Sequence, residues 1–228
     1  MSIAPKRFVK ILATLALITI CLTGPARANE DSPQRWRTRF DIGGNIPINP
    51  TTSQLGGPIT SGGEMDLDAG MTFDFGVGYQ VAPWFTLEGA FGFIYNEIDS
   101  VGNWSYPDSS LLQMPIMLNA EFSIPFGRLS PYAGIGAGGV WSNVRFGSYN
   151  YYYYSDSDGW GTDFVPAAQA FAGLRYEFDN NWSAGISYRF VAVPGQDWDV
   201  DWWNGADFEF GVNKLFTHSI CVTFNATF

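Results

Sequence analysis

Apolar and polar side chains alternate along most of the chain after residue 34. Between Met65 and Val81 every odd position is apolar, whereas the even positions hold Asp, Gly, Thr or Gln. Successive side chains of a strand point to opposite faces, so the pattern predicts a strand with one apolar face. A helix would spread these residues around its circumference. Similar alternation predicts eight strands in all, at residues 35–42, 65–81, 85–93, 112–122, 131–142, 168–178, 183–190 and 220–228.

The polar face of these strands carries many glycines and charges of both signs. Small residues suit the crowded interior of a small barrel, so we expect the large apolar side chains to face lipid. Buried charges require partners, so the charged side chains of this parity are predicted to form one network inside the barrel. They are Arg37, Arg39, Asp41, Asp74, Glu88, Glu121, Arg175, Glu177 and Arg189. The network either only fills the barrel or lines a narrow, negatively biased water path for cations.

The connections between the predicted strands alternate between short and long. Short ones are expected at Ala82-Pro83, 126–128 and 179–181, and long ones at 43–64, 96–111, 144–163 and 191–207. Short periplasmic turns and long extracellular loops are typical of outer-membrane barrels, in which closure leaves no unpaired edge in lipid. The predicted fold is therefore all-β: a transmembrane antiparallel up-and-down β-barrel of eight strands. An eight-stranded interior is only about wide enough for side chains, which argues against a wide general porin.

The first 28 residues read as a secretory signal peptide. Basic residues precede the apolar segment Ile11–Leu22, and Ala26-Arg27-Ala28 follows it as a cleavage site. Cleavage after Ala28 leaves residues 29–34 as a short periplasmic tail and 35–228 as the barrel. Cys21 suggests a lipoprotein signal as an alternative, but Ile20 before it is bulkier than such signals favour.

Removal of residues 1–28 makes the chain strongly acidic. It takes away four of the 12 basic residues and none of the 22 acidic ones, which leaves a formal charge of −14. Nucleic-acid binding requires a basic surface, so this charge argues against that class of function. Cys221 is the only cysteine left and predicts no intramolecular disulfide.

Three segments carry a family resemblance: Leu111–Phe122 (LLQMPIMLNAEF), Pro131–Gly138 (PYAGIGAG) and Leu174–Phe190 (LRYEFDNNWSAGISYRF). They resemble the small OmpA-like and opacity-protein barrels of the outer membrane of Gram-negative bacteria. The resemblance implies contact with membrane lipid and lipopolysaccharide. It also implies that Phe224 and Phe228 belong to a C-terminal signal read by the outer-membrane assembly machinery. Because the sequence stops at Phe228, no periplasmic domain is expected after the barrel.

Two predicted loops are acidic and aromatic, and their aromatic side chains are candidates for contact with a host or envelope ligand. They are Tyr151, Tyr152, Tyr153, Tyr154, Trp198, Trp202 and Trp203. Asp197, Asp199 and Asp201 have the spacing of a calcium loop, but Trp202 stands where that loop requires Gly. The alternative is a strand extension above the membrane with Asp on one face. No metal or cofactor is therefore predicted.

The sequence shows no set of catalytic side chains on one face. His218 shares the parity of the outward residues, whereas the adjacent Ser219 points inward, so the two cannot act together. We expect a non-enzymatic outer-membrane barrel with an envelope-integrity or surface-interaction, adhesin-like role through its loops. The alternative is a narrow porin-like channel for small cations or small solutes.

Overall fold

The computed structural model describes residues 36–55, 62–147, 159–202 and 208–228. The predicted signal peptide and the tail 29–34 lie outside these ranges and stay predictions. The regular structure of the described residues consists of strands. They are β1 (Trp36–Ile48), β2 (Thr52–Leu55), β3 (Met65–Leu67), β4 (Gly70–Ala82), β5 (Phe85–Val101), β6 (Trp104–Ser123), β7 (Leu129–Phe146), β8 (Gly159–Glu177), β9 (Trp182–Val193), β10 (Gln196–Trp202), β11 (Phe208–Val212) and β12 (Leu215–Thr227). Nowhere in these ranges is there a helix with the length and apolar character needed to cross a membrane.

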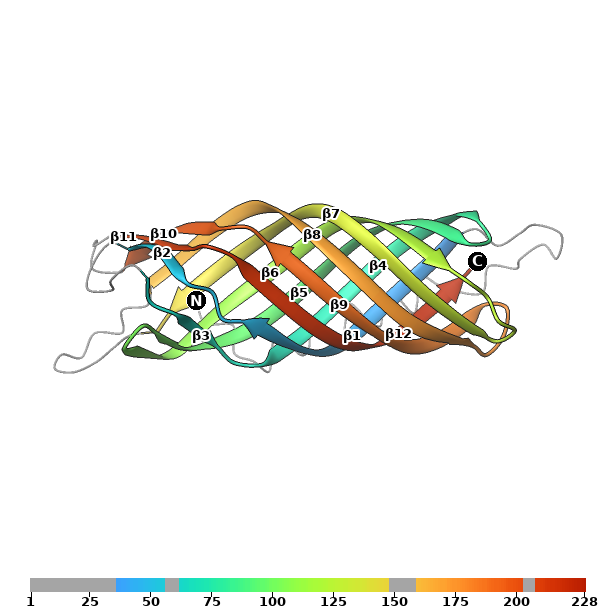
Figure 1. Cartoon of the computed structure of the whole chain (residues 1–228), viewed down its shortest axis with the longest axis horizontal. Coiled ribbons are helices and arrows are strands. Elements are labelled where there is room, and N and C mark those ends of the chain that lie inside the picture. Colours follow the sequence, from blue (N-terminus) through green and yellow to red (C-terminus); the bar gives the residue numbers. More distant parts are fainter. Residues whose placement is uncertain (1–35, 56–61, 148–158, 203–207) are drawn as a thin grey trace. The chain divides into compact units, whose positions relative to one another are not determined.

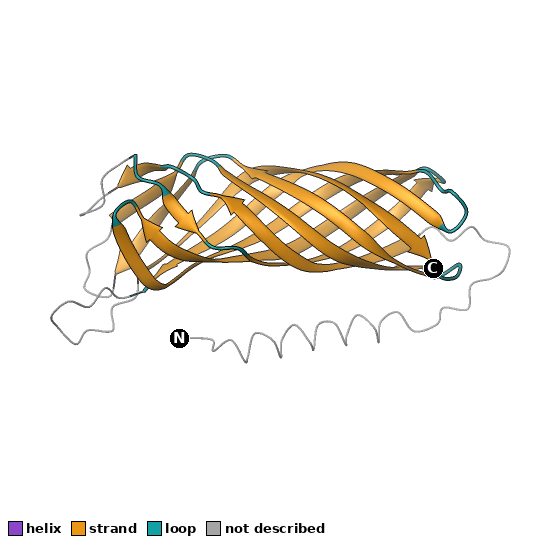
Figure 2. Cartoon of the chain, turned by 60° about the horizontal axis from the view of Figure 1, so that its bottom comes forward, coloured by secondary structure: helices purple, strands orange, loops and turns teal. Residues whose placement is uncertain are grey.

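Eight of the strands close into a ring. The order is β1-β4-β5-β6-β7-β8-β9-β12, every neighbouring pair is antiparallel, and β12 returns to β1 (Figures 1 and 2). Phe40 of β1, for example, lies opposite both Phe75 and Phe224. The predicted eight-stranded antiparallel barrel is thereby confirmed.

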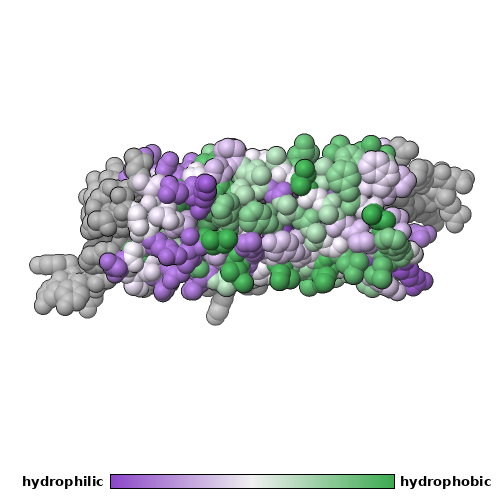
Figure 3. Space-filling model, viewed as in Figure 1, coloured by the Kyte–Doolittle hydropathy of each residue, from purple (hydrophilic) through white to green (hydrophobic). Residues whose placement is uncertain are grey.

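Large apolar side chains cover the outside of the ring, and the space-filling view shows them concentrated away from the end that carries β2, β3, β10 and β11 (Figure 3). We call this surface the apolar belt; exposed members include Trp36, Ile42, Val77, Leu87, Ile116, Leu118, Ile135, Leu174, Ile186, Ile220, Val222 and Phe224. Meanwhile Arg39, Asp41, Glu88 and Glu121 are each only 1% exposed inside the ring. Polar side chains inside and apolar ones outside are the arrangement that lipid requires.

The turns at one end, the turn end, are short as predicted: residues 83–84, 124–128 and 178–181 separate the paired strands. At the opposite loop end, the prediction of a long loop at 96–111 is wrong. β5 continues to Val101 and β6 begins at Trp104, with Gly102 in the left-handed region at φ +62° between them. Continued pairing keeps the backbone hydrogen bonds of this segment satisfied.

Four neighbouring strands of the ring are interrupted at the loop end. β4, β1, β12 and β9 stop there, and the wall continues as β3, β2, β11 and β10 after short breaks at residues 68–69, 49–51, 213–214 and 194–195. The other four strands, β5 to β8, run through the same level with 17 to 20 residues each. A barrel strand needs only about 9–11 residues to cross a membrane. The wall therefore extends beyond the apolar belt as a collar, which consists of β2, β3, β10, β11 and the loop-end parts of β5–β8.

The breaks reverse which parity faces inward. Met65 and Leu67 of β3 are buried, but in β4 the buried residues are Thr72 and Asp74. The prediction of a single strand over 65–81 with one outward apolar face is therefore wrong. Asp68 and Ala69 are both exposed and together shift the alternation by one residue.

Candidate functional site

The turn-end part of the interior holds a network of ion pairs between strands that are far apart in the sequence. Arg37 of β1 binds Glu121 of β6 with both ends of its guanidinium, Nη1 to Oε1 and Nη2 to Oε2, each at 2.7 Å. Arg175 of β8 adds a third bond, from Nη2 to Oε1 of the same carboxylate at 3.0 Å. Glu121 of β6 thus joins β1 and β8, which are not its neighbours in the ring, through charge-assisted hydrogen bonds.

A second group of ion pairs lies next to the first. Arg39 places Nη2 at 2.8 Å from Glu88 Oε1 and Nε at 3.3 Å from Asp41 Oδ2. Arg189 donates to Asp41 Oδ2 at 2.7 Å and also pairs with Asp74. The remaining oxygen of Asp41 accepts a hydrogen bond from Thr223. Each of these charges therefore has an opposite charge beside it, as burial demands.

The charge network is electrically balanced. Its arginines are Arg37, Arg39, Arg175 and Arg189, and its acids are Asp41, Asp74, Glu88 and Glu121. Of the nine charges predicted to meet, the structure brings these eight together. Glu177 is half-buried and accepts instead from Ser130 Oγ at 3.0 Å. Because these eight charges balance, they do not give the interior the net negative charge that was suggested for a cation channel.

Neutral side chains that were not among the predicted residues complete the network. Asn119 donates from Nδ2 to Glu88 Oε1 at 2.9 Å and accepts from Gln169 Nε2 at 2.5 Å. The ring of Phe171 lies 5.2 Å from Cζ of Arg39, and the ring of Tyr132 lies 4.5 Å from Cζ of Arg175. The inward parity of these residues was the signal that identifies them.

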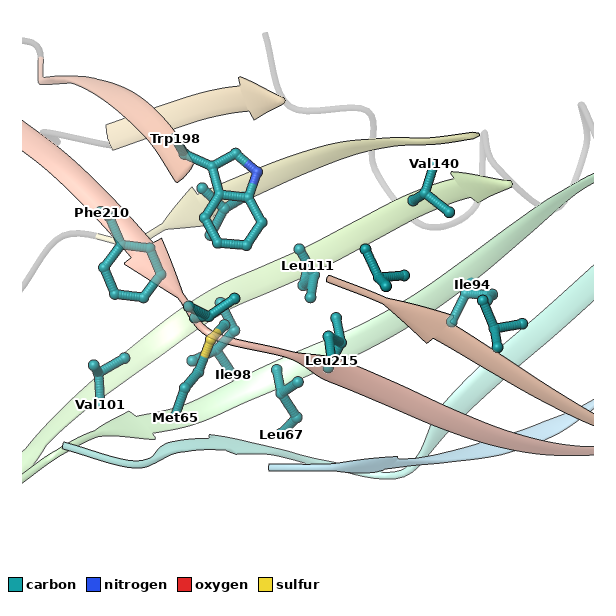
Figure 4. Close-up of a cluster of buried hydrophobic side chains, with 14 of the residues drawn as sticks. Met65, Leu67, Ile94, Ile98, Val101, Leu111, Val140, Trp198, Phe210 and Leu215 are labelled. Atoms are coloured by element: carbon teal, nitrogen blue, oxygen red, sulfur yellow. The ribbon is translucent and has the colours of Figure 1, made fainter. Parts of the chain in front are cut away.

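The loop-end part of the interior contains a large apolar cluster instead of ion pairs. We call this cluster the apolar core; it comprises Met65, Leu67, Ile94, Ile98, Val101, Leu111, Met117, Val140, Val144, Phe146, Ala167, Val191, Val193, Trp198, Val200, Phe210, Val212 and Leu215 (Figure 4). It combines residues of the collar with residues of the ring just below it. Filled in this way, the interior is packed with side chains at both ends.

Trp198 lies in the middle of this apolar core and not on the surface. Its side chain is fully buried, stacks on Phe210 with ring centroids 5.7 Å apart, and donates from Nε1 to Ser142 Oγ at 2.9 Å. The prediction of a loop contact therefore does not fit Trp198. The other six candidates are not placed: Tyr151, Tyr152, Tyr153, Tyr154 and Trp203 lie outside the described residues, as does the side chain of Trp202.

The outer face of the collar is acidic. Asp197, Asp199 and Asp201 of β10 are exposed and alternate with the buried Gln196, Trp198 and Val200. This is the strand extension that was predicted as the alternative to a calcium loop. Across the described ranges, no three His, Cys, Asp or Glu side chains gather in a group that could hold a metal ion.

The candidate residues on the last strand face the sides that the alternation of the strand predicts. His218 faces outward, with Nδ1 at 2.6 Å from the hydroxyl of Tyr188, whereas Ser219 is buried. Phe224 and Phe228 are 48% and 41% exposed, and Cys221 is buried with a free thiol. The outward Phe224 suits lipid contact, while a role in assembly stays a prediction.

Comparison with known proteins agrees with this geometry. The family described as "Outer membrane protein beta-barrel domain" matches residues 13–216. No curated protein sequence matches the chain significantly. OprG from Pseudomonas aeruginosa superposes with a TM-score of 0.55 at 13% identity, over 86% of this chain and 97% of OprG. Neisserial surface protein A gives 0.53 at 10% identity, over 85% and 97% of the two chains. AlkL gives 0.52 at 20%, over 90% and 95%. At these identities the likeness shows the fold alone.

Proposed function

Because the chain belongs to the outer-membrane β-barrel family, we propose that it is a closed, non-enzymatic barrel whose collar serves surface interactions or envelope integrity. The family match supports the location in the outer membrane of a Gram-negative bacterium and contact with its lipid. The role itself is our inference from the interior and the collar.

One observation supports the closed state most directly: two different fillings occupy the interior in series. The charge network cross-links β1, β4, β5, β6, β8 and β9 at the turn end. The apolar core, with Trp198, Phe210 and Val140 each 0% exposed, fills the loop end. An ion on the barrel axis would have to break buried ion pairs and then enter an apolar region, and both steps are costly.

The collar supports the surface role. Its short strands are hydrogen-bonded to their neighbours, with β10 paired to β11, β11 to β2 and β3 to β5. Such a wall holds connecting loops on a rigid base, which favours binding by lowering the entropy that is lost on contact. Orientation with the collar outside the cell, contact with lipopolysaccharide, and recognition of Phe224 and Phe228 by the assembly machinery belong to the same proposal.

Planar-bilayer recording tests the closed state. We expect no reproducible single-channel steps from the folded protein, because an ion would have to break the charge network and then pass the apolar core. The double variant Arg39→Ala with Trp198→Ala serves as the positive control, since it removes a large side chain from each filling. Regular steps from the unmodified protein would overturn the proposal in favour of the narrow channel. Lipid A mass spectrometry with and without expression tests the non-enzymatic assignment, and a modified lipid A would overturn it.

A further inference from the structure

The last strand of the ring and the break before it carry the only lysine and the only histidine that follow residue 28 in the sequence. Lys214 is exposed in the break, and His218 is the fourth residue of β12. Four residues of extended chain separate them by about 13 Å. The chain after residue 28 has a formal charge of −14, so two neighbouring side chains that can both be cationic are an exception to its acidic character.

His218 lies on the outer face at the loop-end margin of the apolar belt. It is directly opposite Ile46 of β1 and Phe190 of β9, and β9 and β12 lie side by side (Figure 1). Two residues farther from the loop end, Ile220 is 71% exposed on the same face. An ionisable side chain among outward apolar residues is costly in lipid and marks a functional position. Lys214 lies beyond it, where the belt gives way to the collar.

The imidazole ring of His218 is held by two aromatic residues of β9. Its Nδ1 lies 2.6 Å from the hydroxyl of Tyr188, and its ring centroid lies 5.1 Å from that of Phe190. We assign the phenolic hydroxyl as the donor of the hydrogen bond, which places the proton of the neutral imidazole on Nε2. The protonated ring carries a proton on Nε2 as well. In both states Nε2 is therefore a hydrogen-bond donor.

This donor requires an acceptor from outside the protein. Among the described residues, Tyr188 is the hydrogen-bond partner of the ring. The outward residues of β1 beside it, Gly44, Ile46 and Ile48, have no polar side chain, and lipid hydrocarbon has no acceptor either. The acceptor that membrane lipids place at this margin belongs to their headgroups.

Lys214 indicates the charge of that acceptor. Its side chain is exposed and makes no ion pair with a described residue. A headgroup between Lys214 and His218 meets one donor from the water side and one from the hydrocarbon side. A phosphate oxygen accepts from an ammonium and an imidazole in strong, charge-assisted hydrogen bonds, whereas the acidic outer face of the collar repels it elsewhere.

We propose that His218 and Lys214 together bind the phosphate of one membrane-lipid headgroup, with Tyr188 as the positioning residue that turns Nε2 toward it. The site rests on the proposed outer-membrane role, because it gives the expected lipid contact one defined position on β12. It is independent of the filling of the barrel, since all three side chains lie on the outer face. An intact, closed barrel without this site would leave the proposed function standing.

The test uses the single histidine as a reporter. The mature protein is purified without a histidine tag, labelled with nitrogen-15 in histidine and reconstituted in digalactosyldiacylglycerol bilayers, which contain no phosphorus. Dioleoyl phosphatidic acid is added as a small fraction of the lipid in phosphate-free buffer. Solid-state NMR then measures the loss of each ring-nitrogen signal through dipolar coupling to phosphorus. Inorganic phosphate without phosphatidic acid forms the second arm, and heat-modifiable gel mobility shows separately that each variant is folded.

We expect the signal loss of Nε2 to saturate with phosphatidic acid and to exceed that of Nδ1 at least about twofold, because the hydrogen bond places Nε2 nearer the phosphorus. Lys214→Gln should raise the fraction of phosphatidic acid needed for half of this loss about two- to fivefold, the range for one exposed charge pair. Tyr188→Phe should bring the losses of the two nitrogens toward equality, because the ring then loses the bond that orients it.

A histidine elsewhere on the margin is the matched control. Met71 is 62% exposed as the second residue of β4, so Met71→His in a His218→Phe background places an imidazole in lipid without Tyr188 or Lys214 beside it. This variant should show no saturable loss. Absence of loss at Nε2 of His218, an equal loss at position 71, an equal loss with inorganic phosphate alone, or no effect of Lys214→Gln would each overturn the proposal. If Tyr188→Phe does not fold, the other comparisons decide.

Discussion

The barrel section inside the apolar belt and the collar above it follow opposite rules. In the barrel section Arg39 and Glu88 face inward, while Leu118 and Ile220 are exposed. In the collar the buried residues are Trp198 and Val200, and Asp199 faces outward. The same antiparallel wall thus serves both regions. The two regions differ in the surrounding medium. In lipid, apolar side chains are stable on the outer surface, whereas in water they are stable when buried inside.

Two halves of the wall achieve this reversal differently. In β3–β4 a two-residue break moves the apolar parity from inside to outside, with Leu67 buried and Phe73 outward. In β5 no break occurs before Ile98, and the residue types change instead: Phe93 and Tyr95 face outward in the belt, and Glu97 replaces them in the collar. Alternation of apolar and polar residues therefore does not by itself determine which face of a strand contacts water.

The largest effect is expected from removal of a charge inside the barrel section. Arg39→Leu leaves Glu88 and Asp41 without their partner, which should destabilise the protein by about 3–5 kcal/mol. Unfolding in urea, followed by heat-modifiable gel mobility, measures the loss. Arg128→Leu in an exposed turn is the matched control and should change little. Equal midpoints for Arg39→Leu and the parent would show that the polar filling does not stabilise this section.

The second-largest effect is expected from a charge on the outer face, which should destabilise the belt but not the collar. Leu118 is 66% exposed in the belt, so Leu118→Lys should destabilise by about 2–4 kcal/mol if this position lies near the middle of the membrane. Thr162→Lys places the same charge on the outer face of the collar and should stay within about 0.5 kcal/mol. The measurement is unfolding in lipid vesicles. Similar losses for both variants would contradict the assignment of the belt to lipid and the collar to water.

The exchange of inward and outward parity between the barrel section and the collar limits what the sequence could predict. The eight strands and the inward charges were predictable, because strand alternation fixes which side chains share a face and closure in lipid fixes the rest. From Met65 to Val81 the odd positions stay apolar across the break, so nothing in the pattern marks the change of face. For this reason Met65 could not be assigned to a core. The partners within the charge network were also beyond prediction, since they join positions such as Arg37 and Glu121 across the ring.

A smaller effect should come from the hydrogen bond that fixes the centre of the collar. Trp198→Phe retains an aromatic ring against Phe210 but removes the donor to Ser142 Oγ. We expect a loss of about 0.5–1.5 kcal/mol, seen as faster proteolysis of the collar while the barrel section stays folded. Trp160→Phe on the outer face is the control and should leave the rate unchanged, because Trp160 is 54% exposed. If Trp198→Phe also changed the heat-modifiable gel mobility, the whole barrel would be destabilised, which would contradict the independence of the two regions.

The smallest effect, and the one of opposite sign, is expected on the acidic face of the collar. Asp199 of β10 lies directly opposite Glu209 of β11, and both are exposed. Like charges in this position repel, so Asp199→Lys should stabilise the collar by about 0.2–1 kcal/mol at low salt. Resistance to proteolysis measures the gain, which should vanish in about 1 M salt because screening then acts over about 3 Å. Asp197→Lys is the control for the β10–β11 edge, since Asp197 faces Gly211 there and no carboxylate of β11. A gain that survives high salt, or an equal gain from Asp197→Lys, would mean that packing and not repulsion governs this face, and the collar would then differ less from the belt than its charges suggest.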